Sequence, residues 1–260
     1  MLEITSIPAI IEELARDPLR HIALLKHLLA YPAHATARRI SGPNGAATLV
    51  AVDAQVVPHD RSAYPKAAIV AFIASDDVEL TEELIRPMPR GVGIVLKLAR
   101  DEDLAPLKAR FAVERRTGLV SFTSAGTFAP ALDVEITLMP SNAAYEMFDA
   151  QGHSRSFLEP LFHHHKAFAC ILAQGSEPIS ACFAYENYGT VWEVGGVIVA
   201  PAHRKKGLGA RVVRTALAEL ARRGLVPRYQ VEESNLASIA LARAIGLVPF
   251  WTITHYAHDC

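Results

Sequence analysis

The sequence predicts an α/β (α+β) fold: a mixed central sheet flanked by helices, preceded by a second α+β domain. Two observations support this prediction. Runs of β-branched and apolar residues, typical of buried strands, alternate along the chain with stretches whose apolar residues recur at helical spacing. The character of the chain also changes near residue 130, where the stretch TSAGTFAPALD indicates a connection. We therefore expect a first domain over residues 1–130 and a second over residues 131–260.

Length and composition narrow the class of protein. A chain of 260 residues, 51% of them hydrophobic, can build one large or two ordinary domains. The net charge of −1 argues against a general nucleic-acid binder. The three cysteines form no C-x-x-C pair, the start of the chain has no signal-peptide pattern, and no apolar run approaches the ~18 residues of a membrane helix. We expect a cytoplasmic monomer or homodimer that binds neither nucleic acid nor membrane.

In the first half, apolar spacing predicts helices over residues 8–30, with a break at Asp17-Pro18, and over 78–85 and 101–110. Strands are expected at 46–52, 67–74 and 93–98, and the GPNG sequence at 42–45 is a turn signal before the first of them. His59-Asp60-Arg61 lies between two expected strands, and we interpret it as solvated charge on a loop. No catalytic constellation is evident in this half.

In the second half, strands are expected at 134–139, 168–173, 179–186, 190–199, 227–232 and 248–256. Helices are expected at 143–150, with Ser141 or Asn142 as the N-cap, and at 154–164, 207–223 and 236–244. The tract His163-His164-His165 falls near the end of the second helix. Successive histidines on a helix point in different directions, so we interpret the tract as a surface or substrate-facing helix end and expect no metal site.

The most informative stretch joins the expected strand at 190–199 to the helix at 207–223. Its turn is Arg204-Lys205-Lys206-Gly207-Leu208-Gly209. A helix start exposes unpaired N–H groups and carries partial positive charge, so phosphates bind there readily. Two glycines remove side chains that would hold a ligand away from these amides, and three basic residues add charge. The alternative is an ordinary strand–helix turn with a solvated basic face, but the glycine spacing favours an anion site.

Residues 130–260 resemble the GNAT superfamily of acyl-CoA-dependent N-acetyltransferases. The family's [QR]-x-x-G-x-[GA] turn is matched by Arg204-x-x-Gly207-x-Gly209, and the lead-in Val199-x-Pro201-x-x-Arg204 is also similar to the family's. A second family element is matched by Asn235-x-x-Ser238-x-x-Leu241 followed by Gly246-Leu247. In the first half, Pro89-Arg90-Gly91-Val92-Gly93 puts arginine directly before glycine, out of register. We interpret that half as a degenerate copy of the same fold in a tandem arrangement, which packs against the catalytic domain or shapes its acceptor pocket.

The resemblance implies an acetyl-CoA site. The backbone amides of the turn would hold the CoA pyrophosphate beside Arg204; they belong to Lys205, Lys206, Gly207, Leu208, Gly209 and Ala210. Val197 and Val199 would offer strand backbone to the pantetheine arm. Asn235 and Ser238 would contact the same cofactor from the next helix, although Asn235 alone also suits a helix cap and Ser238 a packing position.

The resemblance also implies a general base, for which Glu193 on the preceding strand is the candidate. A solvent-facing or edge position is the alternative for Glu193. Gly195-Gly196 predicts a bulge in this strand, where the family frees an N–H for the thioester oxygen. Family members often place a tyrosine after the leucine of the second motif, to protonate the leaving thiolate. Here that position is Ala242, so Tyr256 on the last strand is the substitute candidate, with packing as its alternative role.

The function implied is transfer of an acetyl or other acyl group from acetyl-CoA to a primary amine of a small molecule or peptide, directly within a ternary complex. Because the tyrosine is absent, a non-catalytic acyl-CoA-binding module with a regulatory role is the alternative. Both hypotheses predict acyl-CoA binding, and they differ in turnover.

Overall fold

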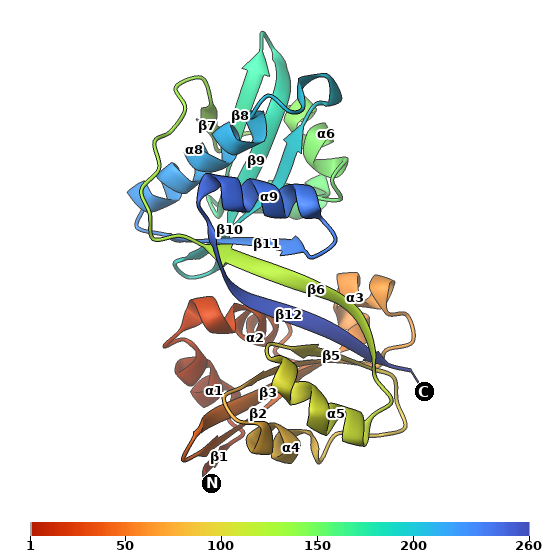
Figure 1. The fold of residues 1–260 in the computed structure, drawn as a ribbon. Coiled ribbons are helices and arrows are strands. Elements are labelled where there is room, and N and C mark those ends of the chain that lie inside the picture. The colour runs from red at the N-terminus through yellow and green to blue at the C-terminus, as the bar shows by residue number, and fades with distance from the viewer. Residues whose placement is uncertain (1, 260) are drawn as a thin grey trace. The chain divides into compact units, whose positions relative to one another are not determined.

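Two units make up the fold of this computed structural model, which describes residues 2–259 (Figure 1). Unit 1 holds the chain up to Val120 together with the stretch from Trp251 onward, and unit 2 holds Ser121–Phe250. The end of the chain therefore groups with its beginning. Division into independently folding domains 1–130 and 131–260 stays a prediction. No helix among the described residues is long and apolar enough to cross a membrane.

Unit 1 consists of a mixed β-sheet and the helices that connect its strands. Its elements in chain order are β1 (Leu2–Ile4), α1 (Ile7–Leu14), α2 (Pro18–Ala30), β2 (Ala35–Gly42), β3 (Gly45–Asp53), η1 (Ala54–Val56), α3 (Pro58–Ala63), β4 (Ile69–Ser75), α4 (Val78–Ile85), β5 (Ile94–Leu98), η2 (Asp101–Asp103), α5 (Leu104–Arg110) and β6 (Glu114–Thr123). The strand order runs β1-β2-β3-β4-β5 and continues to β12 (Val248–His258). The β4/β5 pair is parallel, whereas the ladders β1/β2, β2/β3, β3/β4 and β5/β12 are antiparallel.

Unit 2 is built in the same way. It contains β7 (Glu135–Thr137), α6 (Asn142–Asp149), α7 (Arg155–His163), β8 (Ala167–Gln174), β9 (Glu177–Tyr188), β10 (Val191–Val199), η3 (Pro201–His203), α8 (Leu208–Arg222), β11 (Val226–Glu232) and α9 (Leu236–Ile245). The strand order is β7-β8-β9-β10-β11, and the parallel pair is β10/β11.

The two halves of the chain repeat one topology. A strand, two helices, three strands, a helix, a strand, a helix and a strand follow one another from β1 to β6, with η1 and α3 inserted, and again from β7 to β12. A parallel pair falls at the same place in both successions, β4/β5 in the first and β10/β11 in the second. This repetition is what the predicted tandem arrangement requires.

The last strand of each succession is divided between the two units. β12, which ends the second succession, pairs with β5 in unit 1 in a register that runs from Thr254↔Leu98 to His258↔Ile94. The last residues of β6, which ends the first succession, belong to unit 2, where the Thr123 hydroxyl donates to the Pro227 carbonyl at 2.7 Å. Unit 1 thus contains most of the closing strand of the second succession, and unit 2 contains the last residues of the closing strand of the first.

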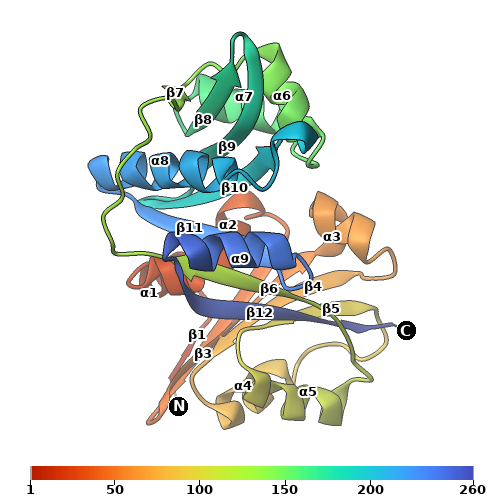
Figure 2. The same ribbon diagram turned by 45° about the horizontal axis from the view of Figure 1, so that its top comes forward.

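Strand alternation divides the sheet of unit 2 into two buried faces (Figure 2). One face packs on α6 and α7, in a core that includes Phe148, Phe162, Ala169 and Phe183. The other face lies under α8, and the guanidinium of Arg223, the C-cap of that helix, lies 4.6 Å from the centroid of the Phe168 ring. Any side chain on the Phe183 face therefore points toward α6 and α7.

The sequence predicted most helices and strands, including the break between α1 and α2 and the Ser141 N-cap of α6. The prediction missed α3, β1, β2 and β6. The interpretation of His59-Asp60-Arg61 as a solvated loop is wrong, because these residues form part of α3 and Asp60 is 1% exposed. Cys170 and Cys182 are buried free thiols, and Cys260 lies outside the described residues.

Candidate active site

β10 and β11 pair at their starts and then separate. The parallel ladder of the described residues joins Val191–Glu193 to Val226–Arg228 and does not extend further along β10. On its other side, β10 remains paired with β9 as far as Val199. The second half of β10 therefore presents one edge whose backbone groups have no ladder partner on β11, and the two strands form a fork.

A bulge shapes the open part of β10. The β9/β10 register shifts between Gly195 and Ile198, so that Gly196 and Val197 leave the ladder, as the sequence predicted. Gly196 has a left-handed φ of 60°, and a Cβ there would lie 2.2 Å from Cε1 of Phe183. Glycine is required at this position, because a side chain would meet the aromatic ring on which the bulge rests.

The turn after β10 leads into a helix start that no side chain caps. Gly207 is the N-cap of α8, with a left-handed φ of 75° and, among the described residues, no side-chain capping hydrogen bond. The first intrahelical bond runs from the Arg211 N–H to the Gly207 carbonyl at 3.2 Å. The N–H groups of Leu208, Gly209 and Ala210 precede that bond and carry the positive end of the helix dipole. They form an anion-binding concavity of the kind that holds phosphate.

This helix start lies directly against the open half of β10. An added Cβ on Gly209 would lie 3.5 Å from Val199 Cγ2 and 3.7 Å from both Val197 Cγ1 and Leu241 Cδ2. The structure thus brings together Val197, Val199 and Gly209, and adds Leu241 of α9. A ligand that ran along the free edge of β10 would reach the amides of α8.

Basic side chains surround the turn. Arg204, Lys205 and Lys206 are exposed, and Arg204 Nε donates to the Val199 carbonyl at 3.3 Å, which places that guanidinium at the end of β10. The first turn of α8 contains no acidic residue. Lys205 has a left-handed φ of 62°, uncommon for a residue with a side chain. The charge and the strained backbone both suit an anionic ligand at this turn.

The residues predicted on α9 have structural partners of their own. Asn235 is the N-cap, and its Oδ1 accepts from the Ser238 N–H at 3.1 Å. The Ser238 side chain hydrogen-bonds to Tyr229, while burial raises the pKa of that tyrosine. Ala242, where the family often has tyrosine, is fully buried. Contacts of Asn235 and Ser238 with CoA stay predictions.

Glu193 lies at the last pair of the fork ladder, opposite Arg228, and is 7% exposed. One carboxylate oxygen accepts from Arg228 Nη1 and, at 3.0 Å, from Asn187 Nδ2; the other accepts from the Gln230 N–H at 3.1 Å. Arg228 is itself 5% exposed and also donates to Ser121 Oγ at 3.2 Å. Glu193 is therefore neither solvent-facing nor free: both of its oxygens are already engaged.

Sequence reasoning did not find the partners of Glu193. Arg228, Asn187 and Ser121 come from three different strands, and only the strand pairing brings them together. Tyr185 is the cross-strand neighbour of Glu193 on β9, and burial followed by the Glu193 charge raises its pKa, against the opposing effect of Arg228. The fork thus holds a buried polar cluster at its closed end.

Tyr256, the predicted acid, is not among the residues that unit 2 brings together. It lies on β12 in unit 1, is 5% exposed, and belongs to the apolar core of that unit with Ile40, Leu84 and Leu96. This buried position fits the alternative role expected for Tyr256, in which its ring packs in an apolar core.

Unit 1 has a different turn at the corresponding place. Between β4 and α4 the chain carries Asp76-Asp77, not Pro89–Gly93, which follows α4. Asp77 caps α4 by accepting from the Glu79 N–H at 2.9 Å, and Asp76 accepts from the Ala46 N–H at 2.9 Å and pairs with Arg20. Carboxylates occupy this helix start, so it repels a phosphate.

Unit 1 also contains a buried polar cluster, formed by residues of α3, β5 and β12 and by Tyr64. Lys97 Nζ lies 2.7 Å from Asp60 Oδ1, and both side chains are nearly inaccessible. His255 is 2% exposed and hydrogen-bonded through Nδ1 to the Tyr64 hydroxyl at 2.8 Å. Burial and the nearby Lys97 charge lower the pKa of His255 to about 3. Burial lowers the pKa of His27 to about 4.

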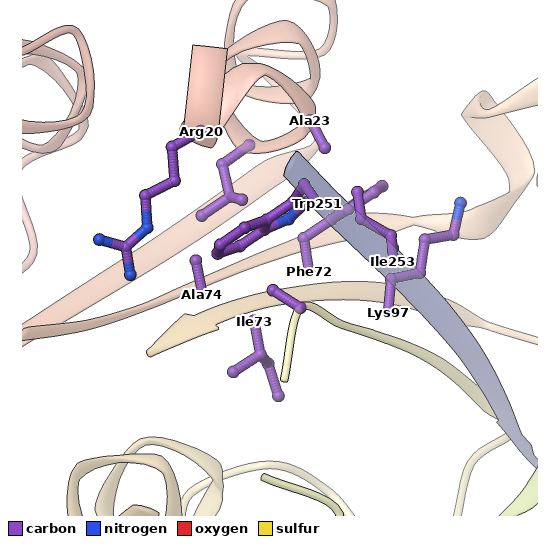
Figure 3. A pocket seen from close by; sticks show the side chains of 10 residues that line it. Arg20, Ala23, Phe72, Ile73, Ala74, Lys97, Trp251 and Ile253 are labelled. Atoms are coloured by element: carbon purple, nitrogen blue, oxygen red, sulfur yellow. The ribbon is translucent and has the colours of Figure 1, made fainter. Parts of the chain in front are cut away.

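Beside this cluster lies a small pocket of unit 1, lined mostly by apolar side chains (Figure 3). Trp251 stands in its middle, and the Arg20 guanidinium lies 5.3 Å from the centroid of the Trp251 ring. Lys97 contributes to the wall but is paired with Asp60. The pocket has no uncapped helix start of the kind found in unit 2.

Comparison with known proteins identifies the second half of the chain. Residues 137–247 match the family model described as the acetyltransferase (GNAT) family. No curated protein matches the chain. Among solved structures, a GNAT-family acetyltransferase from Colwellia psychrerythraea is 12% identical, with 99% of both chains covered and a TM-score of 0.59.

Two further solved structures have similar folds. A tandem GNAT protein from the clavulanic acid biosynthesis pathway is 13% identical, covers 92% of this chain and 87% of its own, and has a TM-score of 0.52. A GCN5-related N-acetyltransferase from Sphaerobacter thermophilus is 12% identical, covers 86% and 80%, and has a TM-score of 0.54. At these identities the likeness concerns the fold, and the family match carries the enzyme class. Residues 137–247 of this chain are thereby identified as an acetyltransferase domain of the GNAT family.

Proposed function

We propose that the protein transfers an acetyl group from acetyl-CoA to a primary amine. The observation that carries this proposal is the fork of β10 and β11, whose free strand edge leads directly to the uncapped start of α8. An extended, amide-bearing arm with a pyrophosphate at one end fits that combination. Its amides would pair with the backbone of Val197 and Val199, and its phosphates would meet the N–H groups from Lys205 to Ala210.

The bulge supports the chemical step. Gly196 and Val197 leave the β9 ladder beside the fork. In the proposed reaction an N–H group of this bulge polarises the thioester carbonyl. Donors fixed in a strand need no reorganisation as charge develops on the oxygen. Such donors contribute on the order of 3 kcal/mol each to transition-state stabilisation.

We assign Glu193 a positioning role, in place of the base role expected from sequence. Accepting an ammonium proton would require it to give up a hydrogen bond from Arg228, Asn187 or the Gln230 N–H. Its carboxylate instead fixes Arg228 at the closed end of the fork. The leaving thiolate needs no dedicated acid, since a thiol has a pKa of about 8.5. Ala242 offers none, and Tyr256 packs in the core of unit 1.

A non-catalytic acyl-CoA-binding module with a regulatory role is the second candidate function. The observation that favours it is Ala242, fully buried where family members often carry tyrosine. Both candidates place acetyl-CoA in the same site, so only turnover separates them.

The test begins with acetyl-CoA binding, measured by calorimetry on the full chain. Gly209→Glu should abolish binding, because it puts a carboxylate beside the pyrophosphate amides. The matched control is Gly209→Ala, which should retain binding because its Cβ would make ordinary contacts of 3.5–3.7 Å. Loss of affinity in both variants, or in neither, would contradict the placement of the pyrophosphate.

Turnover is then followed as free-thiol release from acetyl-CoA with a panel of amines: 2-phenylethylamine, spermidine, α-amino acids and a lysine-containing peptide with a free N-terminus. Thiol release that depends on the amine supports N-acyl transfer. Tight acetyl-CoA binding without thiol release across this panel would favour the regulatory module instead.

A further inference from the structure

His153 is held in the loop between α6 and α7. Gly152 adopts a left-handed φ of 82°, and the His153 N–H returns to the Phe148 carbonyl at 3.1 Å, which closes the end of α6 in a Schellman-type turn. This turn fixes the His153 ring edge-on to Phe183, with ring centroids 5.0 Å apart. The position of the imidazole is thus set by backbone hydrogen bonds and by an aromatic contact.

Phe183 links His153 to the fork. Phe183 is the cross-strand neighbour of Gly195, and its ring is the group that a Cβ on Gly196 would strike at 2.2 Å. Tyr185 and Glu193, each two residues away from this pair on its own strand, are also cross-strand neighbours. Phe183, Gly195, Tyr185 and Glu193 therefore all belong to the face covered by α6 and α7. One aromatic ring therefore contacts both the bulge and His153.

The imidazole is available for proton transfer. Its ring nitrogens make no hydrogen bond within residues 2–259, and the side chain is half-buried. Burial lowers the pKa of His153 below its usual value of 6.5, against the opposing effect of the Glu193 charge. Glu193 on β10 is the charged group that acts on this imidazole, and that carboxylate is paired with Arg228 on β11 and lies opposite Tyr185 on β9. At neutral pH the ring is uncharged and can accept a proton.

We propose that His153 is the general base that deprotonates the acceptor amine beside the Gly195–Gly196 bulge. This inference rests on the proposed acyl transfer. The acceptor enters as an ammonium and gives one proton to the imidazole, which becomes imidazolium. The freed amine lone pair attacks the thioester carbonyl carbon, the C–N bond forms and the C–S bond breaks. CoA leaves as thiolate and takes the second N–H proton, and the imidazolium returns its proton to solvent.

The test compares His153→Gln with Glu146→Gln, a control on an exposed residue of α6 in the same unit. The donor is acetyl-CoA, and the acceptors are 2-phenylethylamine and spermidine, which are ammonium ions at neutral pH, and hydroxylamine, which is largely unprotonated. His153→Gln should lower kcat/KM for the ammonium acceptors by about 10²- to 10⁴-fold and for hydroxylamine far less. The control should match the unsubstituted protein.

The pH profile gives a readout that a purely structural role would not change. In the unsubstituted protein, kcat/KM should fall toward acid as His153 protonates, and this limb should disappear in His153→Gln. Affinity for acetyl-CoA, measured by calorimetry, should be unchanged.

Three other results would contradict the assignment of His153 as the general base. Retained rates and a retained acid limb in His153→Gln would overturn the base assignment while leaving acyl transfer intact. Loss of acetyl-CoA affinity in that variant would overturn it in favour of a structural role. Absence of turnover with all acceptors in the unsubstituted protein would overturn the proposed function, and the base assignment with it.

Discussion

Acidification should destabilise unit 1 through His255. The folded state holds this imidazole uncharged, with a pKa of about 3, because burial and the Lys97 charge disfavour the imidazolium; the ordinary value is 6.5. Between these two pH values the unfolded chain binds one proton more than the folded chain. As far as His255 is concerned, the free energy of unfolding is therefore highest above pH 6.5. It decreases as the pH falls from 6.5 to about 3. At pH 4.5 the loss from this one group amounts to about 2 to 3 kcal/mol.

The measurement uses the two tryptophans, one in each unit. In a Trp192→Phe background, the fluorescence of Trp251 reports on unit 1. Urea titrations at pH 7.5 and 4.5 then give the free energy of unfolding with and without His255→Gln, which keeps a polar group but cannot titrate. His255→Gln should reduce the difference between the two pH values by about 2 to 3 kcal/mol. His59→Gln, on an exposed residue of α3, serves as the control. Equal pH dependence with and without His255→Gln would refute the reasoning.

Three further predictions concern unit 2. Arg228→Met leaves the Glu193 carboxylate buried without its cation and should lower the free energy of unfolding by about 3 to 5 kcal/mol. The double variant Arg228→Met/Glu193→Gln should restore part of this loss. Trp192 fluorescence during urea titration measures the free energy of unfolding of both variants. Asn235→Ala removes the N-cap of α9 and should cost about 1 kcal/mol in the same assay. Gly196→Ala should cost about 1 to 2 kcal/mol from its left-handed φ alone, and more from the clash with Phe183; a cost near zero would contradict the bulge geometry.

Several features of the candidate site were predictable because they depend only on residues close together in the sequence. The glycine spacing at Gly207 and Gly209 required an open helix start, and Gly195-Gly196 required a bulge; both features are present. Each is decided within a few residues, by φ and by the room left for a ligand. The same holds for the Asn235 cap.

The other features of the fold and the site depend on contacts between residues far apart in the sequence, so the sequence did not predict them. Glu193 was recognisable as an unusual strand residue, but its burial against Arg228 depends on the register of two strands that α8 separates in sequence. Asp60 was interpreted as solvated because no residue near it in the sequence indicates its ion pair with Lys97. His153 carried no motif, and the one local signal was the glycine before it. The strands β2 and β6 were missed because polar residues such as Arg38 and Arg115 interrupt their apolar character.

The pairing of β12 with β5 delays the completion of unit 1 during synthesis, because nearly all of unit 2 lies between these two strands in the sequence. Until β12 has been synthesised, β5 has an open edge that the nascent chain cannot yet cover. A stop codon directly before β12 would therefore leave unit 2 almost complete and deprive unit 1 of the strand beside β5.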